Sequence, residues 1–197
     1  MPKMAQNKAK ITRRCPWVPI GDTLYEKYHD EEWGVPIYDD QKIFEFLVLE
    51  SAQAGLSWRT VLGKRENYRL AFAHFDPRRV AKFGPREVAK LLANPGIIRN
   101  RQKIEAAINN AKKFLEVQKE FGTFAKYMWS FVDQQTIKHR FRTLADYLTT
   151  VPEAERWALD LKRRGFKFFG PTTCYAHMQA VGMVNDHTVG CFRRITK

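Results

Sequence analysis

The chain has 197 residues, of which 44% are hydrophobic and 28% are charged, with a formal net charge of +13. This composition excludes a disordered or fibrous protein and is typical of one folded domain with a substantial core. No apolar run approaches the roughly 18 residues of a membrane span, and the basic N-terminus lacks the apolar segment of a secretory signal. Because such a charge favours polyanionic partners, nucleic acid is the first partner class to consider. The alternative is a basic surface that only maintains solubility.

Three cysteines, in a chain without a secretory signal, argue against a disulfide framework and favour a reducing compartment. We therefore expect a cytoplasmic protein. Cys174, which lies among apolar residues, is expected to be a buried core thiol. An anionic membrane is a weaker candidate partner, because no stretch combines a basic face with an apolar Trp/Leu face.

Helical signals follow one another along the chain, so the sequence predicts an all-α fold. A helix is expected over 40–54 with Asp39 or Asp40 as its cap, and a second one begins after Ser57. Further helices are expected after Pro77, after Pro85, and over 100–121, 123–132, 144–148, 152–164 and 171–181, with a last one from residue 186 onward. No segment alternates like a strand between hairpin turns. Residues 133–142 are expected to form the longest loop, residues 1–13 a basic, disordered tail, and residues 14–197 a single domain.

Two cysteines and two histidines near the ends of the chain have the composition of a zinc site: Cys15, His29, His187 and Cys191. The spacing of four between the last two would place both on one face of a helix. Two thiolates and two imidazoles suit a tetrahedral zinc ion, and four protein ligands make such a site structural. The alternative is unrelated thiols and ordinary surface histidines, since short zinc motifs are usually local.

Glu50 lies on the face of its predicted helix that should be buried. A buried carboxylate is costly without a partner, so Glu50 either pairs with a basic residue or awaits a cationic or hydrogen-bond-donating ligand in a pocket. Aromatic residues at helical spacing usually belong to the core. Their number beside this carboxylate nevertheless favours a stacking pocket for an electron-poor flat ring, lined by Trp17, Tyr25, Tyr28, Trp33 and Trp58.

Residues 165–172 predict a hairpin between two helices. Backbone amides at such a turn and at the next helix N-terminus can bind phosphate. Basic side chains add charge nearby: Lys162, Arg163, Arg164 and Lys167. A second candidate is the segment 94–99, which is followed by Arg101 and Lys103. A glycine between helices is more often only a C-cap, so either hairpin alone is a weak signal of DNA binding.

Seven ordered motifs resemble the DNA-3-methyladenine glycosylase I family of bacterial alkylation-repair enzymes. They are RCPW (14–17), YEKYHDEEWGVP (25–36), LESAQAGLSW (49–58), GIIRN (96–100), WSFV (129–132), RGFKF (164–168) and MQAVGMVNDH (178–187). The resemblance covers about residues 14–192, and residues 133–150 carry no family signature.

The resemblance implies the helix-hairpin-helix glycosylase fold with a structural zinc ion, whose ligands fall on the two cysteines and two histidines named above. It also implies excision of N3-methyladenine from double-stranded alkylated DNA, the first step of base excision repair, in the bacterial cytosol. The base-recognition residues fall on Glu50 and the five aromatic residues. We expect a monomer that flips the damaged nucleotide and contacts DNA through Gly55, Leu56, Lys167, Gly170 and Thr172.

Two positions depart from the wider superfamily. Asn185 stands where many relatives carry a catalytic aspartate, and Thr172 stands where bifunctional relatives carry a lyase lysine, so the resemblance implies a monofunctional enzyme. Methylation at N3 makes the adenine cationic, and the base therefore leaves without a general acid. Glu50 is expected to recognise the base, while its catalytic role stays open.

Two other function classes compete with this interpretation. A zinc-containing DNA-binding protein without catalysis would account for the charge, the hairpin and the metal ligands, but not for the aromatic residues around Glu50. A zinc hydrolase would require an open coordination position. The sequence leaves open whether other methylated purines are also excised.

Overall fold

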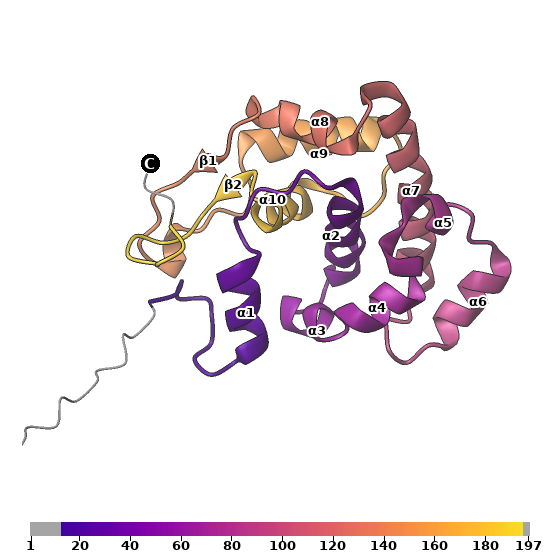
Figure 1. The fold of residues 1–197 in the computed structure, drawn as a ribbon, viewed down its shortest axis with the longest axis horizontal. Helices are drawn as coiled ribbons and strands as arrows, with labels where there is room; N and C mark the ends of the chain where they lie inside the picture. Colours follow the sequence, from indigo (N-terminus) through magenta and orange to yellow (C-terminus); the bar gives the residue numbers. More distant parts are fainter. Residues whose placement is uncertain (1–12, 195–197) are drawn as a thin grey trace, which may run out of the picture.

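The computed structural model describes residues 13–194, which are mostly helical (Figure 1). The first half contains α1 (Thr23–Glu31), α2 (Asp40–Gln53), α3 (Trp58–Gly63), α4 (Arg65–Ala71), η1 (Ala73–Phe75), α5 (Pro77–Val80) and α6 (Pro85–Ala93). The second half contains α7 (Arg101–Phe121), α8 (Phe124–Trp129), η2 (Ser130–Val132), β1 (Ile137–Lys138), η3 (Leu144–Asp146), α9 (Pro152–Arg163), α10 (Pro171–Ala180) and β2 (Val184–Asn185). Residues 1–12 of the predicted tail lie outside the described residues. No described helix is long and apolar enough to cross a membrane.

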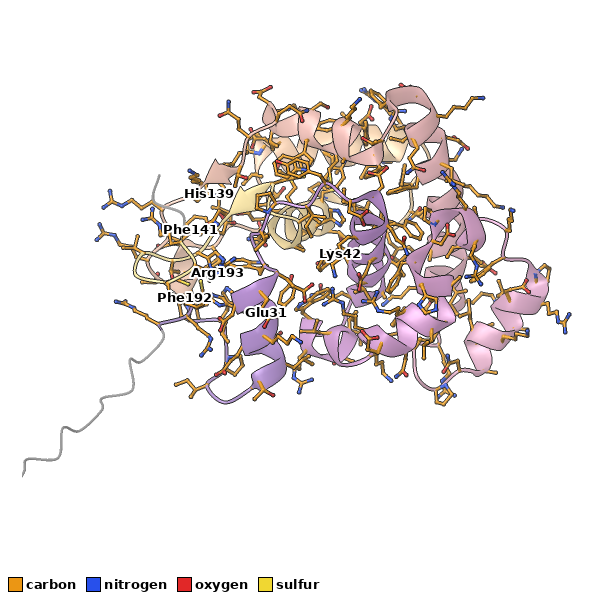
Figure 2. The ribbon with its side chains drawn as sticks, in the orientation of Figure 1. Glu31, Lys42, His139, Phe141, Phe192 and Arg193 are labelled. Atoms are coloured by element: carbon orange, nitrogen blue, oxygen red, sulfur yellow. The ribbon has the colours of Figure 1, made fainter. Side chains whose placement is uncertain are left out.

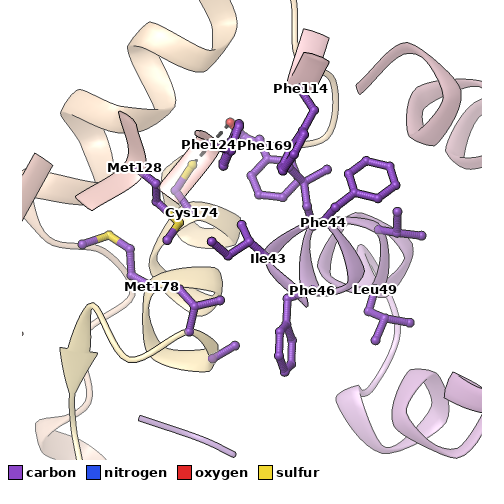
Figure 3. Close-up of a cluster of buried hydrophobic side chains, with 14 of the residues drawn as sticks. Ile43, Phe44, Phe46, Leu49, Phe114, Phe124, Met128, Phe169, Cys174 and Met178 are labelled. Carbon is purple, nitrogen blue, oxygen red and sulfur yellow. Dashed lines mark hydrogen bonds between the residues drawn. The ribbon is translucent and has the colours of Figure 1, made fainter. Parts of the chain in front are cut away.

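Helix α2 forms the centre of the core. Asp39 caps its N-terminus by accepting a hydrogen bond from the amide of Lys42. Residues 43–52 are all buried, because α2 is enclosed by α3, α4, α7, α8 and α10. Its apolar side chains therefore project on several sides, with Phe44 packed against Phe114 at 5.3 Å between ring centroids (Figure 3). The core also contains Cys174, fully buried as expected, whose pKa is raised by burial.

The two ends of the described chain lie side by side (Figures 1 and 2). The amide of Phe192 donates to the carbonyl of Arg13 at 3.0 Å. The segment before α2 also runs along the end of α10, where the amide of Ile37 donates to Val181 O at 3.0 Å. Gly182, at φ +74°, allows this approach, since a Cβ there would lie 2.3 Å from the Pro36 nitrogen.

The structure corrects three sequence-based expectations. The region predicted as one helix after Ser57 is two helices, α3 and α4, which meet at Lys64. A short parallel bridge, β1 with β2, occurs where no strand was predicted. The predicted helix from residue 186 onward is also wrong. Residues 186–188 are non-helical and buried, and the chain then turns at Gly190, φ +91°.

Candidate functional site

The four predicted metal ligands meet at one buried point, although they come from opposite ends of the chain. Their donor atoms lie within 4.8 Å of one another. The Sγ of Cys191 is 3.4 Å from both His29 Nε2 and His187 Nδ1, and the Sγ of Cys15 is 3.4 Å from His187 Nδ1. The last two ligands lie on a turn, not on the helix that their spacing suggested. The Gly190 turn brings Cys191 back toward His187 instead.

These distances fit a tetrahedral ion. Zinc bonds of about 2.3 Å to sulfur and about 2.1 Å to nitrogen place neighbouring sulfur and nitrogen ligands roughly 3.6 Å apart. The second ring nitrogens are already engaged: His29 Nδ1 lies 2.8 Å from Asp30, and His187 Nε2 lies 3.0 Å from the Trp33 carbonyl. This arrangement leaves Nε2 of His29 and Nδ1 of His187 for an ion and fixes both rings. The residues therefore form a closed cluster that could hold a metal with four protein ligands.

Helix α2 carries two buried carboxylates with opposite surroundings. Glu45 is 2% exposed and contacts three cations: Lys42 at 3.1 Å, Arg65 at 2.7 Å and Arg69 at 2.9 Å. Glu50 is 5% exposed, and no hydrogen bond or ion pair joins its side chain to any residue in the described range. Burial raises the pKa of Glu50 to about 8. The alternative of a paired structural carboxylate thus applies to Glu45 and not to Glu50.

The unpaired carboxylate faces a cavity of about 360 Å³, a size typical of small-molecule sites. The cavity is lined by Trp17, Tyr25, Tyr28, Trp33, Glu50, Gln53, Trp58, Leu144, Tyr147, Ala176 and Gln179. All six predicted base-recognition residues belong to this set. The indole Nε1 of Trp58 is also buried without a partner among the described residues. The same holds for the indole Nε1 of Trp17, so the aromatic enclosure around the unpaired Glu50 contains two buried indole N–H groups without a partner among the described residues.

The aromatic rings join the pocket directly to the Cys/His cluster. Trp33 contacts the His187 ring at 4.7 Å and the Trp17 ring at 4.9 Å between centroids. Elsewhere in the lining, the ring centroids of Tyr28 and Trp58 lie 5.4 Å apart. Burial, followed by the nearby Glu50 carboxylate, raises the pKa of Tyr28 well above its ordinary value. The cluster thus fixes the part of the lining that carries Trp17 and Trp33, while α1, α2 and α3 contribute Tyr25, Tyr28, Glu50, Gln53 and Trp58.

Sequence reasoning missed five lining residues. Gln53 and Gln179 lie within two of the motifs quoted above, so their polar side chains on otherwise apolar segments were an available signal. Ala176 sits on the same helix as Gln179. Leu144 and Tyr147 come from the stretch without family motifs, and no periodic pattern in the sequence assigned them to the site.

A buried network holds the wall that carries Gln179. Asp186 accepts hydrogen bonds from Gln179 Nε2 at 2.7 Å and from the hydroxyl of Tyr175, and it contacts His139 Nδ1 at 2.6 Å. The hydroxyl of Tyr147 donates to the Asp186 carbonyl at 3.1 Å. His139 and Phe141 lie together on the β1 side of the molecule (Figure 2). Residues that follow β1 thus brace the pocket wall by contacts with the chain after β2.

The predicted hairpin connects α9 to α10. Asn110 of α7 braces it through two 2.8 Å hydrogen bonds, to the amide and to the carbonyl of Lys167. The Lys167 amide is therefore occupied, while its side chain is exposed. The N-terminus of α10 follows Gly170, and its first-turn amides, including that of Thr172, have no intrahelical partner. Arg164, expected to add charge here, is instead paired with Asp160 and Glu120.

The predicted Gly55–Leu56 turn lies at the edge of the pocket, between the lining residues Gln53 and Trp58. Gly55 adopts φ +77°, and Leu56 is 39% exposed. An exposed apolar side chain beside a pocket is well placed to contact a ligand that enters it.

Comparison with known proteins gives one consistent result. The methyladenine glycosylase family model matches residues 17–194. DNA-3-methyladenine glycosylase 1 of Escherichia coli (strain K12) is 49% identical over 178 residues, which is 90% of this chain and 95% of the relative.

Solved structures of the same family superpose closely on this chain. A crystal structure of 3-methyladenine DNA glycosylase I superposes with a TM-score of 0.90 at 50% identity, covering 93% of this chain and 100% of the other. A variant of 3-methyladenine DNA glycosylase I in complex with 3-methyladenine superposes with a TM-score of 0.87 at 36% identity, covering 89% and 95% of the two chains. This chain belongs to the methyladenine glycosylase family.

Proposed function

We propose that this protein is a monofunctional DNA glycosylase that flips N3-methyladenine out of double-stranded DNA and hydrolyses its N-glycosidic bond. The observation that carries the proposal is the unpaired Glu50 carboxylate in a cavity of aromatic side chains. Similarity to relatives named for this reaction supports the choice of substrate.

The pocket would recognise the base by stacking, shape and charge. Trp58 and Tyr28, which line the cavity, would offer ring surfaces for the purine. Because the pKa of Glu50 is about 8, the empty pocket holds this group largely protonated at neutral pH. A cationic methylated base favours the ionised form of Glu50. The carboxylate then accepts hydrogen bonds from the base and carries the opposite charge.

Excision needs little acid–base chemistry from the protein. The glycosidic bond breaks with its electron pair moving to the cationic base, which leaves neutral. A water molecule adds to the oxocarbenium-like sugar and loses a proton, giving an abasic site. Glu50 stabilises a charge that disappears during this step, so we assign it to recognition and not to acceleration of bond cleavage. Asn185, buried in the β1–β2 bridge, and Thr172 leave the chain without the aspartate and the lyase lysine of other superfamily members.

DNA would be held mainly through its phosphates. The free amides after Gly170, including that of Thr172, and the side chain of Lys167 would bind the backbone at the hairpin. Leu56, supported by Gly55, would fill the gap left by the flipped nucleotide. One chain contains the whole pocket, so the proposed enzyme works as a monomer, with residues 14–197 as its single domain in the bacterial cytosol.

Zinc is the ion that we assign to the Cys15, His29, His187 and Cys191 cluster. Its two thiolates and two imidazoles are a donor set that zinc prefers, and the measured spacing suits a tetrahedral geometry. Bound there, the ion would supply folding free energy by joining the two ends of the chain. Four buried protein ligands leave no position for substrate, which disfavours a zinc hydrolase.

A phosphate-dominated interface predicts a steep salt dependence. Each phosphate contact that releases a counterion should contribute about −0.9 to the slope of log K against log salt concentration. Titration of duplex DNA between low and physiological salt measures this slope. A flat dependence would remove the proposed DNA surface, whatever the activity of the protein.

Release of free base from alkylated duplex DNA tests the function directly. The purified protein should release 3-methyladenine and leave an abasic site without strand cleavage. Binding without release would favour the non-catalytic DNA-binding protein. The same assay on DNA that carries several methylated purines will show whether N3-methylguanine or larger adducts are also excised.

A further inference from the structure

The last carbonyl groups of α2 need hydrogen-bond donors from outside the helix. The last turn of the helix contains no basic residue, and the chain leaves the helix at Ala54 and Gly55 before Ser57 caps α3. The last carbonyls of a helix have no intrahelical donor and lie at the negative end of the helix dipole. A donor from elsewhere in the fold is therefore needed to fix this end.

Lys103, in the first turn of α7, supplies that donor. Its Nζ donates to Ala52 O at 2.8 Å and to Ala54 O at 2.6 Å. The contact joins residues about 50 positions apart in sequence, so it depends on the tertiary fold. Partial burial lowers the pKa of Lys103, and the two carbonyl contacts replace part of the hydration that its ammonium group loses.

The clamped carbonyls lie immediately before the turn at the pocket edge. Leu56 continues from them, and its amide donates to Gln53 O at 2.6 Å. Gln53 and Trp58, on the two sides of the turn, both line the pocket, whereas Lys103 does not. Lys103 thus acts on the pocket through the backbone at the end of α2 and through the turn.

We propose that Lys103 is a positioning residue for base extrusion. By fixing the carbonyl end of α2, it holds Leu56 where this side chain fills the space vacated by the flipped nucleotide. The proposal rests on the excision function proposed above. It assigns a role in opening the duplex to a basic residue that touches neither the base nor the reacting bond.

The role predicts a substrate-dependent defect. Extrusion costs a few kcal/mol for a paired base and least for one that is already unpaired. Loss of the clamp should therefore slow excision from a duplex, while a lesion in a single strand should be excised almost normally. A residue needed only for stability would lower the rate on both substrates by the same factor.

The test compares Lys103→Met with wild type on one methylated strand, assayed alone and annealed to its complement. Loss of a charge-assisted hydrogen bond corresponds to about a tenfold lower kcat/KM on the duplex. We expect less than about a twofold change on the strand alone, because no pair has to be opened there. Lys103→Arg should recover most of the duplex activity, since it restores charge and donors. Binding of free 3-methyladenine should be unchanged, because the pocket lining is intact.

Two further variants separate the mechanism from general effects. Lys112→Met removes the same charge from an exposed site on α7, and its effect should be equal on both substrates. Leu56→Ala should reproduce the duplex-only defect, and the double variant with Lys103→Met should add little, because both act through one element.

Equal losses on the two substrates, or fully additive losses in the double variant, would overturn the role of Lys103. A wild-type protein that releases no base from either substrate would overturn the proposed function itself. The two failures are therefore distinguishable.

Discussion

The Cys/His cluster and the Glu50 pocket are neighbours built from similar materials, yet they are satisfied in opposite ways. Both are buried, and Trp33 contacts both. In the cluster, each histidine has one nitrogen engaged by Asp30 or Trp33 and the other directed at a thiol. In the pocket, the Glu50 carboxylate has no protein partner within residues 13–194.

A buried polar group that is fully engaged stabilises one arrangement, whereas one left unpaired costs free energy until a ligand arrives. The comparison therefore assigns stability to the cluster and recognition to the pocket. Variants of each site should change one property and spare the other.

The largest effect is expected at the cluster. Cys15→Ala or Cys191→Ala should lower metal content and thermal stability together, because metal binding to the folded state contributes folding free energy. We expect a loss of about 4 kcal/mol, or roughly 8–16 °C in Tm for a chain of this length. Metal analysis and thermal melts measure both quantities.

Cys174→Ala is the matched control, since this thiol is equally buried but lies outside the cluster. It should retain full metal content. If a Cys15 or Cys191 variant kept both its metal and its stability, the four-ligand site would be wrong.

Burial of the unpaired Glu50 should make the free energy of unfolding depend on pH. Unfolded Glu50 ionises near pH 4.5, whereas the folded protein holds its proton up to about pH 8. Between these values the folded state binds the extra proton, so Glu50 lowers stability progressively as pH rises, and the cost is constant above pH 8.

Glu50→Gln removes this pH-dependent loss of stability, because glutamine does not ionise. The variant should match wild type below pH 4.5 and exceed its stability by about 4 kcal/mol near pH 8. Denaturant unfolding at several pH values measures the difference. A variant less stable than wild type at neutral pH would show that Glu50 has a stabilising partner after all.

The next largest effect is expected on the affinity for the free base. Glu50→Gln should weaken binding of free 3-methyladenine about ten- to a hundredfold, as expected for loss of a charge-assisted hydrogen bond worth roughly 1.5–3 kcal/mol. Titration calorimetry with the free base measures this change.

Glu45→Gln provides the contrast on the same helix. It breaks contacts with three cations and should destabilise the fold while leaving base affinity per folded molecule unchanged. Equal affinity in the Glu50 variant and wild type would remove Glu50 from base recognition.

The sequence predicted most helices and six residues that line the cavity, but it predicted local geometry less well. Caps and prolines gave the starts of α2, α3, α5 and α6, because these signals act within a few residues. The four residues of the Cys/His cluster were predicted from their chemistry, while the helix assigned to His187 and Cys191 was wrong. Buried tertiary contacts of Asp186 and the Gly190 turn determine that segment, and no local pattern reports them.

Tyr147 shows the same limit at the pocket. It reaches the site from a loop held by η3 and by its hydroxyl contact with the Asp186 carbonyl. Glu45 gives an example within a helix. Its buried carboxylate is neutralised by arginines 20 and 24 positions further along the chain. Partners at such separations follow from the fold, not from periodicity.

The smallest effect is expected from Trp58, the ring that we propose stacks on the base. Trp58→Ala should weaken binding of 3-methyladenine about tenfold, since stacking of a base on an aromatic side chain is worth roughly 1–3 kcal/mol. Every purine has a stacking face, so the loss should be similar for 3-methyladenine and for unmodified adenine. The ratio of the two affinities should therefore stay near its wild-type value. In Glu50→Gln the ratio should fall, because we expect the Glu50 carboxyl to transfer its proton to neutral 3-methyladenine and to pair with the resulting cation, which glutamine cannot do. Competition titrations with both bases measure the ratio, and a collapse of discrimination in Trp58→Ala would show that the indole, through its unpaired Nε1–H, reads the base edge as well as its face.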